Sequence, residues 1–147
     1  MIAKKIFLSL FLLLSSTSLY GMGIFYKADI SAQKAYKMQQ NGAILLDIRT
    51  PGEYKQDHPK EAFLIPAFFE KDGERVFNHQ FIDQVYELLK GDMDKELLLI
   101  CRSGSRTKFA ANILGREGFT QVYNIAHGFK TTQYKDDWSD LNLPIEK

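Results

Sequence analysis

The chain has 147 residues, of which 45% are hydrophobic and 13% aromatic. This length and composition suit one domain with a substantial apolar core. The 19 basic and 18 acidic residues nearly cancel, so no overall field draws the protein to nucleic acid or to an anionic membrane. Composition therefore excludes polyanion binding through net charge, and any preference for anions must be local.

Residues 1–21 are interpreted as a secretory signal peptide and not as part of the fold. Two lysines precede an apolar core from Ile6 to Leu14, and small polar residues follow, which is the layout of an export signal. The apolar core is short for a bilayer span, although an uncleaved anchor or an amphipathic first helix is the alternative. Ser18 and Gly23 fit cleavage positions. We expect an exported, periplasmic protein whose folded domain comprises residues 24–147.

The rest of the chain predicts strands that alternate with helices. Short apolar runs predict buried strands at 23–30, 43–49, 62–69, 96–101 and 121–126. Capping residues, apolar periodicity and closing glycines predict helices at 31–40, 79–91 and 106–118, with one helical turn followed by a loop at 53–62. The segment 70–79 is expected to be a polar connection. This alternation predicts an α/β fold with a mostly parallel central sheet flanked by helices on both faces.

Cys101 is the single cysteine of the chain and ends the apolar run 96–101. In open α/β sheets the chemistry gathers at the carboxyl ends of the strands. Asp47 and Arg49 end another strand at the same edge. An exported chain with one cysteine cannot form an internal disulfide, so the thiol is buried and inert, paired with another molecule, or reactive.

The loop after Cys101 favours a reactive thiol. Small residues between two arginines let successive backbone N–H groups point inward before the next helix begins. Such a concave set of N–H groups can bind an anion. The amides, the helix dipole and the guanidinium groups are expected to stabilise thiolate over thiol. The loop residues are Arg102, Ser103, Gly104, Ser105 and Arg106. We therefore predict a cysteine nucleophile in an anion-binding loop.

Two sequence blocks resemble the rhodanese family, namely LLDIRTPGEY at 45–54 and CRSGSRT at 101–107. The resemblance extends over about residues 30–144. It implies a single rhodanese-like domain in which Cys101 carries a persulfide. Asp47 and Arg49 are expected to support the loop through an ion pair at the strand end. Further matches to the family pattern are Pro51, Glu53, Tyr54, Gly115, Gly118, Phe119, Leu143 and Pro144.

The chain departs from the family pattern around the loop. The segment 56–62 keeps only His58 and Ala62 of the usual turn, and His127 stands where the family tends to have a glycine. An insertion at 131–137 displaces the family tryptophan to Trp138. His127 either lines the pocket or packs within its loop. These departures bear on acceptor specificity more than on the reaction.

The resemblance implies a sulfurtransferase that moves a sulfane sulfur from thiosulfate, or a similar small anion, to cyanide or a thiol. The alternative is a persulfide carrier or polysulfide-binding module that delivers sulfur to a partner protein without fast turnover. No cofactor is expected, no metal-ligand spacing is present, and no nucleic acid is expected as a partner. Residue patterns leave the enzyme and the carrier open, since both use Cys101.

Cysteine phosphatases on a related fold are a rival interpretation, which the length of the loop tests. These enzymes place five residues between the cysteine and the arginine, in a loop that holds a tetrahedral phosphate. Here four residues separate Cys101 from Arg106. The smaller cradle favours a sulfur atom over phosphoryl or arsenate groups.

Overall fold

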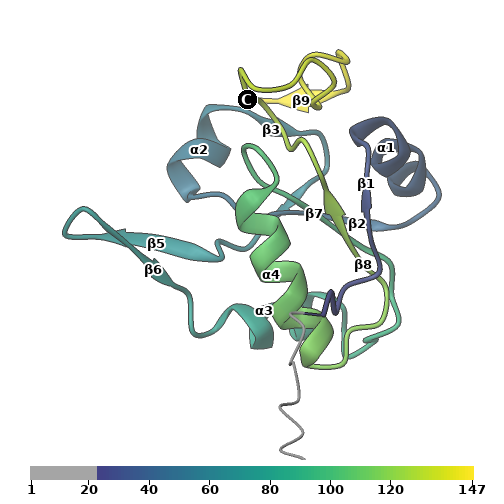
Figure 1. The fold of residues 1–147 in the computed structure, drawn as a ribbon, viewed down its shortest axis with the longest axis vertical. Helices are drawn as coiled ribbons and strands as arrows, with labels where there is room; N and C mark the ends of the chain where they lie inside the picture. The colour runs from purple at the N-terminus through teal and green to yellow at the C-terminus, as the bar shows by residue number, and fades with distance from the viewer. Residues whose placement is uncertain (1–22) are drawn as a thin grey trace, which may run out of the picture.

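The computed structural model describes residues 23–147 (Figure 1), so the expected signal peptide lies outside the described residues. The centre is a five-stranded sheet with the order β1-β8-β7-β2-β4, and each neighbouring pair is parallel. The strands are β1 (Ala28–Ile30), β2 (Ile44–Asp47), β4 (Phe63–Leu64), β7 (Leu97–Ile100) and β8 (Val122–Ile125). The α/β prediction with a parallel sheet is confirmed.

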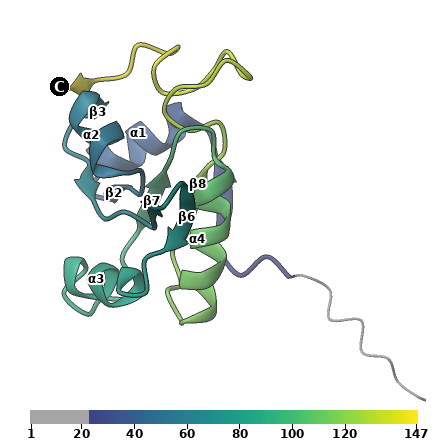
Figure 2. The ribbon, with the colours of Figure 1, turned by 90° about the vertical axis from the view of Figure 1, so that its left-hand side faces the viewer.

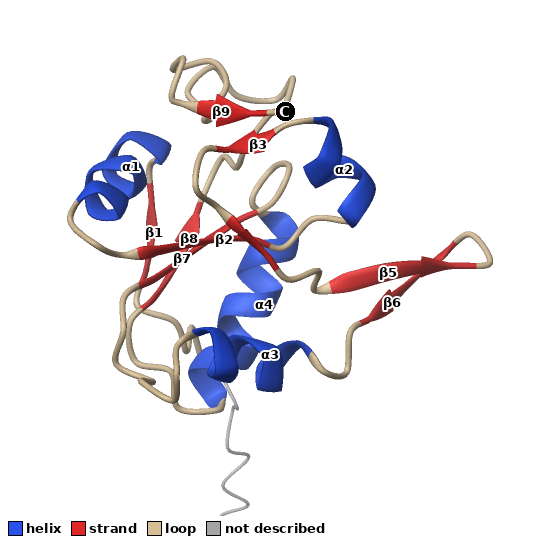
Figure 3. Cartoon of the chain, turned by 180° about the vertical axis from the view of Figure 1, so that it is seen from behind, coloured by secondary structure: helices blue, strands red, loops and turns tan. Residues whose placement is uncertain are grey.

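Helices cover both faces of this sheet (Figure 3). In β7, Leu97 and Leu99 enter a core with α3 and α4, whereas Leu98 and Ile100 enter a second core with α1. Alternate side chains of a strand point to opposite faces, and burial on both faces explains why the strand sequences are continuously apolar. The helices are α1 (Ala32–Gln40), α2 (Pro51–Gln56), α3 (Phe81–Leu88) and α4 (Ser105–Arg116). The helix that carries the loop, α4, lies beside β8 (Figures 1 and 2).

Local capping sets the beginnings of the first two helices. The side chain of Ser31 accepts a hydrogen bond from the backbone N–H of Lys34, as its position predicts. Thr50 and Glu53 form a reciprocal capping box at the start of α2, where Pro51 occupies the first turn. The helical turn expected in this region therefore begins two residues earlier, at Pro51.

The segment from 62 to 79 differs from the prediction. Only Phe63–Leu64 joins the sheet, as β4, while β5 (Phe68–Lys71) and β6 (Glu74–Phe77) form an antiparallel hairpin that projects from the body (Figure 1). The expected polar connection was wrong. Asp72 and Gly73 form the turn with φ of 53° and 80°, and Asp-Gly is a preferred pair for such a turn. The Asp-Gly pair was thus a signal for a hairpin turn in the sequence, but the charged residues around it are typical of a loop.

The C-terminal segment adds a small feature that no pattern predicts. β3 (His58–Pro59) and β9 (Ile145–Glu146) pair in antiparallel fashion near α2 (Figure 3). Strands of two residues carry no periodicity for a sequence pattern to detect. Among residues 23–147 no helix has the length and apolar character needed to cross a membrane.

Candidate active site

The topology brings the candidate residues to one edge of the sheet. β2 and β7 are parallel neighbours, and Asp47 lies opposite Ile100 in their register. Cys101 directly follows β7, and Arg49 follows β2 by two residues. The cysteine loop and the Asp47–Arg49 pair therefore meet at the carboxyl edge, as expected for an open parallel sheet.

Cys101 lies fully buried between the end of β7 and the start of α4. Its Sγ accepts a hydrogen bond from the backbone N–H of Gly104 at 3.2 Å. Thr107 Oγ1 lies 3.4 Å from the same sulfur and donates its own proton to the carbonyl of Gly104 at 2.9 Å. The loop thus wraps around the sulfur, and its surroundings supply polar partners to an otherwise apolar site.

Thr107 is a site residue that sequence reasoning missed. It stands one residue after the loop, where the first turn of α4 places its hydroxyl against the thiol. The signal was a hydroxyl residue six positions after the cysteine, and the fold buries that residue completely.

Two glycines allow the cysteine loop to pack closely against the segment that follows β8. Gly104 has a φ of +91°, and a Cβ there would lie 1.9 Å from the carbonyl oxygen of Ala126. Gly128 has a φ of +70°, and its Cβ would lie 2.6 Å from the carbonyl oxygen of Cys101. Only a residue without a side chain fits such contacts at positive φ. The loop conformation therefore depends on contacts from a distant part of the chain.

Asp47 and Arg49 form the expected ion pair, and both side chains are buried. Arg49 Nε and Nη2 donate to the carboxylate at 2.8 to 3.0 Å, and Nη2 also donates to the carbonyl of Asp57 at 2.7 Å. The guanidinium carbon lies 4.3 Å from the centre of the Phe129 ring. Arg49 thus connects the end of β2 to the end of α2 and to the segment after β8.

Arg106 binds a partner that the sequence analysis did not assign. Its Nη1 and Nη2 donate to the two carboxylate oxygens of Glu53 at 2.9 and 2.8 Å. Such a bidentate pair is strong and directional. Because Glu53 neutralises the charge of Arg106 and this pair holds α2 against α4, Arg106 contributes less to anion binding by the loop than its sequence position suggests.

The environment of this pair shifts both titrations. Burial raises the pKa of Glu53, but hydrogen bonds from Arg106 and from Thr50 outweigh that effect, and the pKa falls from 4.5 to about 2. The hydrogen bond to Glu53 in turn raises the pKa of the Arg106 guanidinium. Both groups are therefore charged at neutral pH.

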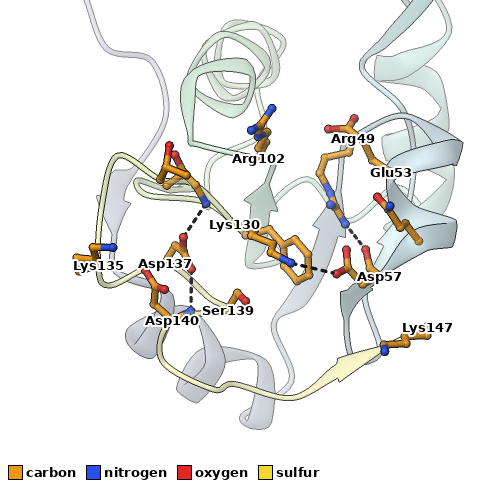
Figure 4. A pocket seen from close by; sticks show the side chains of 14 residues that line it. Arg49, Glu53, Asp57, Arg102, Lys130, Lys135, Asp137, Ser139, Asp140 and Lys147 are labelled. Atoms are coloured by element: carbon orange, nitrogen blue, oxygen red, sulfur yellow. Dashed lines mark hydrogen bonds and ion pairs between the residues drawn. The ribbon is translucent and has the colours of Figure 1, made fainter.

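Arg102 remains exposed and lies between two hollows. The larger, called the insertion pocket here, has a volume of about 750 Å³ and is lined by α2, Arg49 and the segment from Phe129 to Asp140 (Figure 4). The smaller, called the hairpin pocket, has a volume of about 540 Å³ and lies between Pro51, Phe69 and Arg102. Arg102 is thus the cation of the loop that is open to ligands on either side.

His127 does not line either hollow. It pairs with Asp136 and stacks on Tyr134, with ring centres 3.8 Å apart. The structure thus agrees with packing within its own loop. His58 also has a packing role, since it stacks on Tyr54 and hydrogen-bonds the carbonyl of the same residue at 2.8 Å.

The protein has a parallel sheet that helices cover on both faces. A cysteine follows the middle strand, β7, in a loop that Gly104 and Gly128 allow to pack closely. Together these features are typical of a rhodanese-like domain. Residues 31–134 match the family model of the Rhodanese-like domain, and the chain belongs to this family.

Relatives and solved structures agree with this assignment. The chain is 31% identical over 118 residues to the thiosulfate sulfurtransferase GlpE of Haemophilus influenzae, which covers 80% of this chain and 93% of the relative. It is 30% identical over 124 residues to the uncharacterized protein RP600 of Rickettsia prowazekii, covering 79% and 94%. The crystal structure of Rv0390 from M. tuberculosis matches 82% of this chain and 98% of its own, with a TM-score of 0.67 at 23% identity. The last match shows the shared fold.

Proposed function

We propose that the protein is a sulfurtransferase that moves a sulfane sulfur from thiosulfate, or a similar anionic donor, to cyanide or a thiol through a persulfide on Cys101. The observation that carries this proposal is the loop, in which the N–H of Gly104 donates to Sγ at 3.2 Å. A backbone N–H aimed at this sulfur is a hydrogen-bond donor placed where the persulfide would form. Similarity to GlpE supports thiosulfate as the donor.

The reaction is a two-step exchange on one sulfur. The thiolate of Cys101 attacks the outer sulfur of thiosulfate, the sulfur–sulfur bond of the donor breaks, and sulfite leaves with the bonding electron pair. The cysteine then carries a persulfide. Cyanide or a thiolate attacks the terminal sulfur, takes it, and the electron pair of the broken bond returns to Cys101 as thiolate.

The two arginines of the cysteine loop have different roles, because one binds the donor and the other supports the loop. Arg102 is exposed beside the loop, so its charge attracts the anionic donor. Arg106 is held by Glu53, so it positions the start of α4 against α2. This division assigns the donor-binding role to Arg102.

The test is sulfur loading and turnover. Purified protein incubated with thiosulfate should gain one sulfur atom on Cys101 by peptide mass spectrometry, and added cyanide should yield thiocyanate continuously. The Cys101→Ser variant should do neither, because the nucleophile is absent. A wild-type protein that gains no sulfur would overturn the proposal.

A carrier that delivers sulfur to a partner protein is the second candidate. The complete burial of Cys101 favours it, because a buried persulfide is protected from solvent thiols. Loading with thiosulfate followed by only a single turnover with cyanide or small thiols would identify the carrier. Sustained thiocyanate release would identify the enzyme.

A further inference from the structure

The insertion pocket is larger than the proposed donor requires. Its volume is about 750 Å³, whereas thiosulfate is a compact anion that the loop and Arg102 can hold. Much of the wall comes from Thr131, Thr132, Lys135 and Asp137, which belong to the insertion at 131–137. The segment 131–137, predicted to be an insertion relative to the family pattern, thus contributes to a hollow beside the cysteine loop.

Arg49 offers this pocket a hydrogen-bond donor that the protein does not use. Only 5% of its side chain is exposed, yet it lines the pocket. Nε and Nη2 are occupied by Asp47 and Asp57, while Nη1 makes no hydrogen bond with any of residues 23–147. Nη1 is not among the buried unpaired polar atoms of the described residues, so it reaches the solvent of the pocket. Because its ion pair fixes the guanidinium, Nη1 is a preorganised donor for an anionic ligand.

Further cations line the same pocket (Figure 4). They are Arg102, Lys130, Lys135 and Lys147. Lys130 Nζ lies 3.9 Å from Asp57, a distance at which an exposed pair is weak. Arg102 and Lys135 have no ion-pair partner in the part of the chain that the structure describes.

Two of the four acidic side chains of the pocket are engaged with groups of the protein. Glu53 is held by Arg106, which does not line the pocket. Asp137 accepts the backbone N–H groups of Thr131 at 2.7 Å and of Asp140 at 2.8 Å. The other two are Asp140, which is exposed, and Asp57, whose only ion pair within residues 23–147 is the long contact with Lys130. Against them stand the side chains of Arg102, Lys130, Lys135 and Lys147, so cations are in excess among the groups left to a ligand.

The pocket wall is hydrogen-bonded to the cysteine loop. The N–H of Phe129 donates to the carbonyl of Cys101 at 2.8 Å, and the N–H of Lys130 donates to the carbonyl of Arg102 at 3.2 Å. These backbone hydrogen bonds fix the wall of the pocket against the cysteine loop, so a ligand in the pocket lies beside the loop that carries Cys101, and proximity of this kind favours transfer between bound groups.

We propose that the insertion pocket binds the sulfur acceptor, and that this acceptor is a small thiol bearing a carboxylate, which Arg49 Nη1, Arg102 and Lys130 receive. This inference rests on the proposed function. The thiolate of the acceptor attacks the terminal sulfur of the Cys101 persulfide, a new sulfur–sulfur bond forms on the acceptor, and the bond to Cys101 breaks. Cys101 leaves as thiolate, and no further oxidant or reductant is consumed.

The test compares two thiols that differ in charge. With saturating thiosulfate, kcat/KM is measured for 3-mercaptopropionate and for neutral 2-mercaptoethanol by release of sulfite. Intrinsic thiol reactivity cancels when the ratio of the two values is compared between proteins. We expect Lys130→Gln to lower this ratio by about fivefold, the effect of losing one partly exposed charge interaction.

Two further variants complete the experiment. Lys95→Gln removes the same charge just before β7, at the opposite end of the strand from Cys101, and should leave the ratio unchanged. Arg49→Lys keeps a cation beside Asp47 but lacks Nη1, so it should also lower the ratio if it folds. An unchanged ratio in Lys130→Gln would overturn the inference, whatever the fate of Arg49→Lys.

Loading of Cys101 with sulfur, measured in the same samples, distinguishes a failure of the acceptor-pocket inference from a failure of the proposed sulfurtransferase function. Normal loading with an unchanged ratio would reject the carboxylate pocket and leave the sulfurtransferase proposal standing. Absent loading in the wild-type protein would reject both.

Discussion

At the scale of single residues, Gly104 has the narrowest steric tolerance in the cysteine loop. Its φ is +91°, and any Cβ would lie 1.9 Å from the carbonyl oxygen of Ala126. We expect Gly104→Ala to lower the free energy of unfolding by about 2 to 4 kcal/mol, since backbone strain and a clash combine. Loss of persulfide loading should accompany this change. Urea denaturation measures the first effect and mass spectrometry the second.

Gly73 provides the matched control for that substitution. It has a similar φ of +80°, but nothing lies within 4 Å of the added Cβ. Gly73→Ala should cost only about 1 kcal/mol, the strain of positive φ alone. Equal costs in the two variants would show that the contact with Ala126 is unimportant.

Thr107 is expected to affect the rate of loading more than the fold. Its hydroxyl lies 3.4 Å from Sγ and can donate to the sulfur when Cys101 acts as the nucleophile. Thr107→Val keeps the shape but removes the hydroxyl, and should slow single-turnover loading by about tenfold, the worth of one hydrogen bond to a charged group. Thr107→Ser should retain most of the rate. A Val variant as fast as the wild type would contradict this role.

The ionisation of Glu53 makes the free energy of unfolding depend on pH. Its pKa is about 2 in the folded protein, against 4.5 ordinarily. A lowered pKa stabilises the fold fully above the ordinary value, and this contribution disappears as the pH falls toward the folded value. With 30% of the Glu53 side chain exposed, we expect a discounted contribution of about 1 to 2 kcal/mol.

The comparison of wild type with Glu53→Gln isolates this contribution, because other carboxylates titrate equally in both proteins. Urea unfolding across the range from neutral pH to about pH 3 should show the wild type losing more stability than the variant. Parallel curves for the two proteins would mean that the pair with Arg106 contributes nothing to stability.

At the scale of elements, the hairpin β5–β6 depends on one of its two faces. Phe77 packs against Phe68 and Phe109, with ring centres 5.6 and 5.9 Å away, whereas Phe69 is 45% exposed. Phe77→Ala should destabilise the protein by about 2 kcal/mol, since it removes a partly buried aromatic contact. Phe69→Ala should change stability by less than about 0.5 kcal/mol.

Thermal unfolding of the two variants measures this difference. Amide hydrogen exchange should in addition show faster exchange in β6 for Phe77→Ala, because the hairpin loses its attachment to α4. A larger loss of stability from Phe69 than from Phe77 would show that the outward face is covered in solution.

The sequence predicts elements well where one pattern dominates. Ser31 marks the start of α1, and the apolar run before Cys101 contains β7, because capping and complete burial leave strong local signals. The hairpin was missed because its central residues 70–75 are all charged apart from Gly73, so that Asp72-Gly73 resembled part of a loop. Two-residue strands such as β3 depend wholly on their tertiary partner.

At the scale of the whole molecule, we propose that the chain is exported and cleaved. The positive charges, apolar core and small polar residues of 1–21 support this proposal. Expression of the full-length chain in a Gram-negative host should place the mature protein in the periplasmic fraction, and intact mass should show cleavage near Ser18 or Gly23. A cytoplasmic protein that retains its first residues would contradict the proposal.

The amino-acid sequence by itself determined the parallel α/β architecture and the position of Cys101 after a buried strand. It also predicted the pairing of Asp47 with Arg49, two residues apart. Burial pattern, capping and short spacing are local properties, so a linear chain displays them. Only the tertiary structure decided that Arg106 binds Glu53, 53 positions away, and that the segment from Phe129 to Asp140 lines a pocket together with Arg49. Such partners depend on how helices and strands that are distant in the sequence contact one another, which no local sequence pattern predicts.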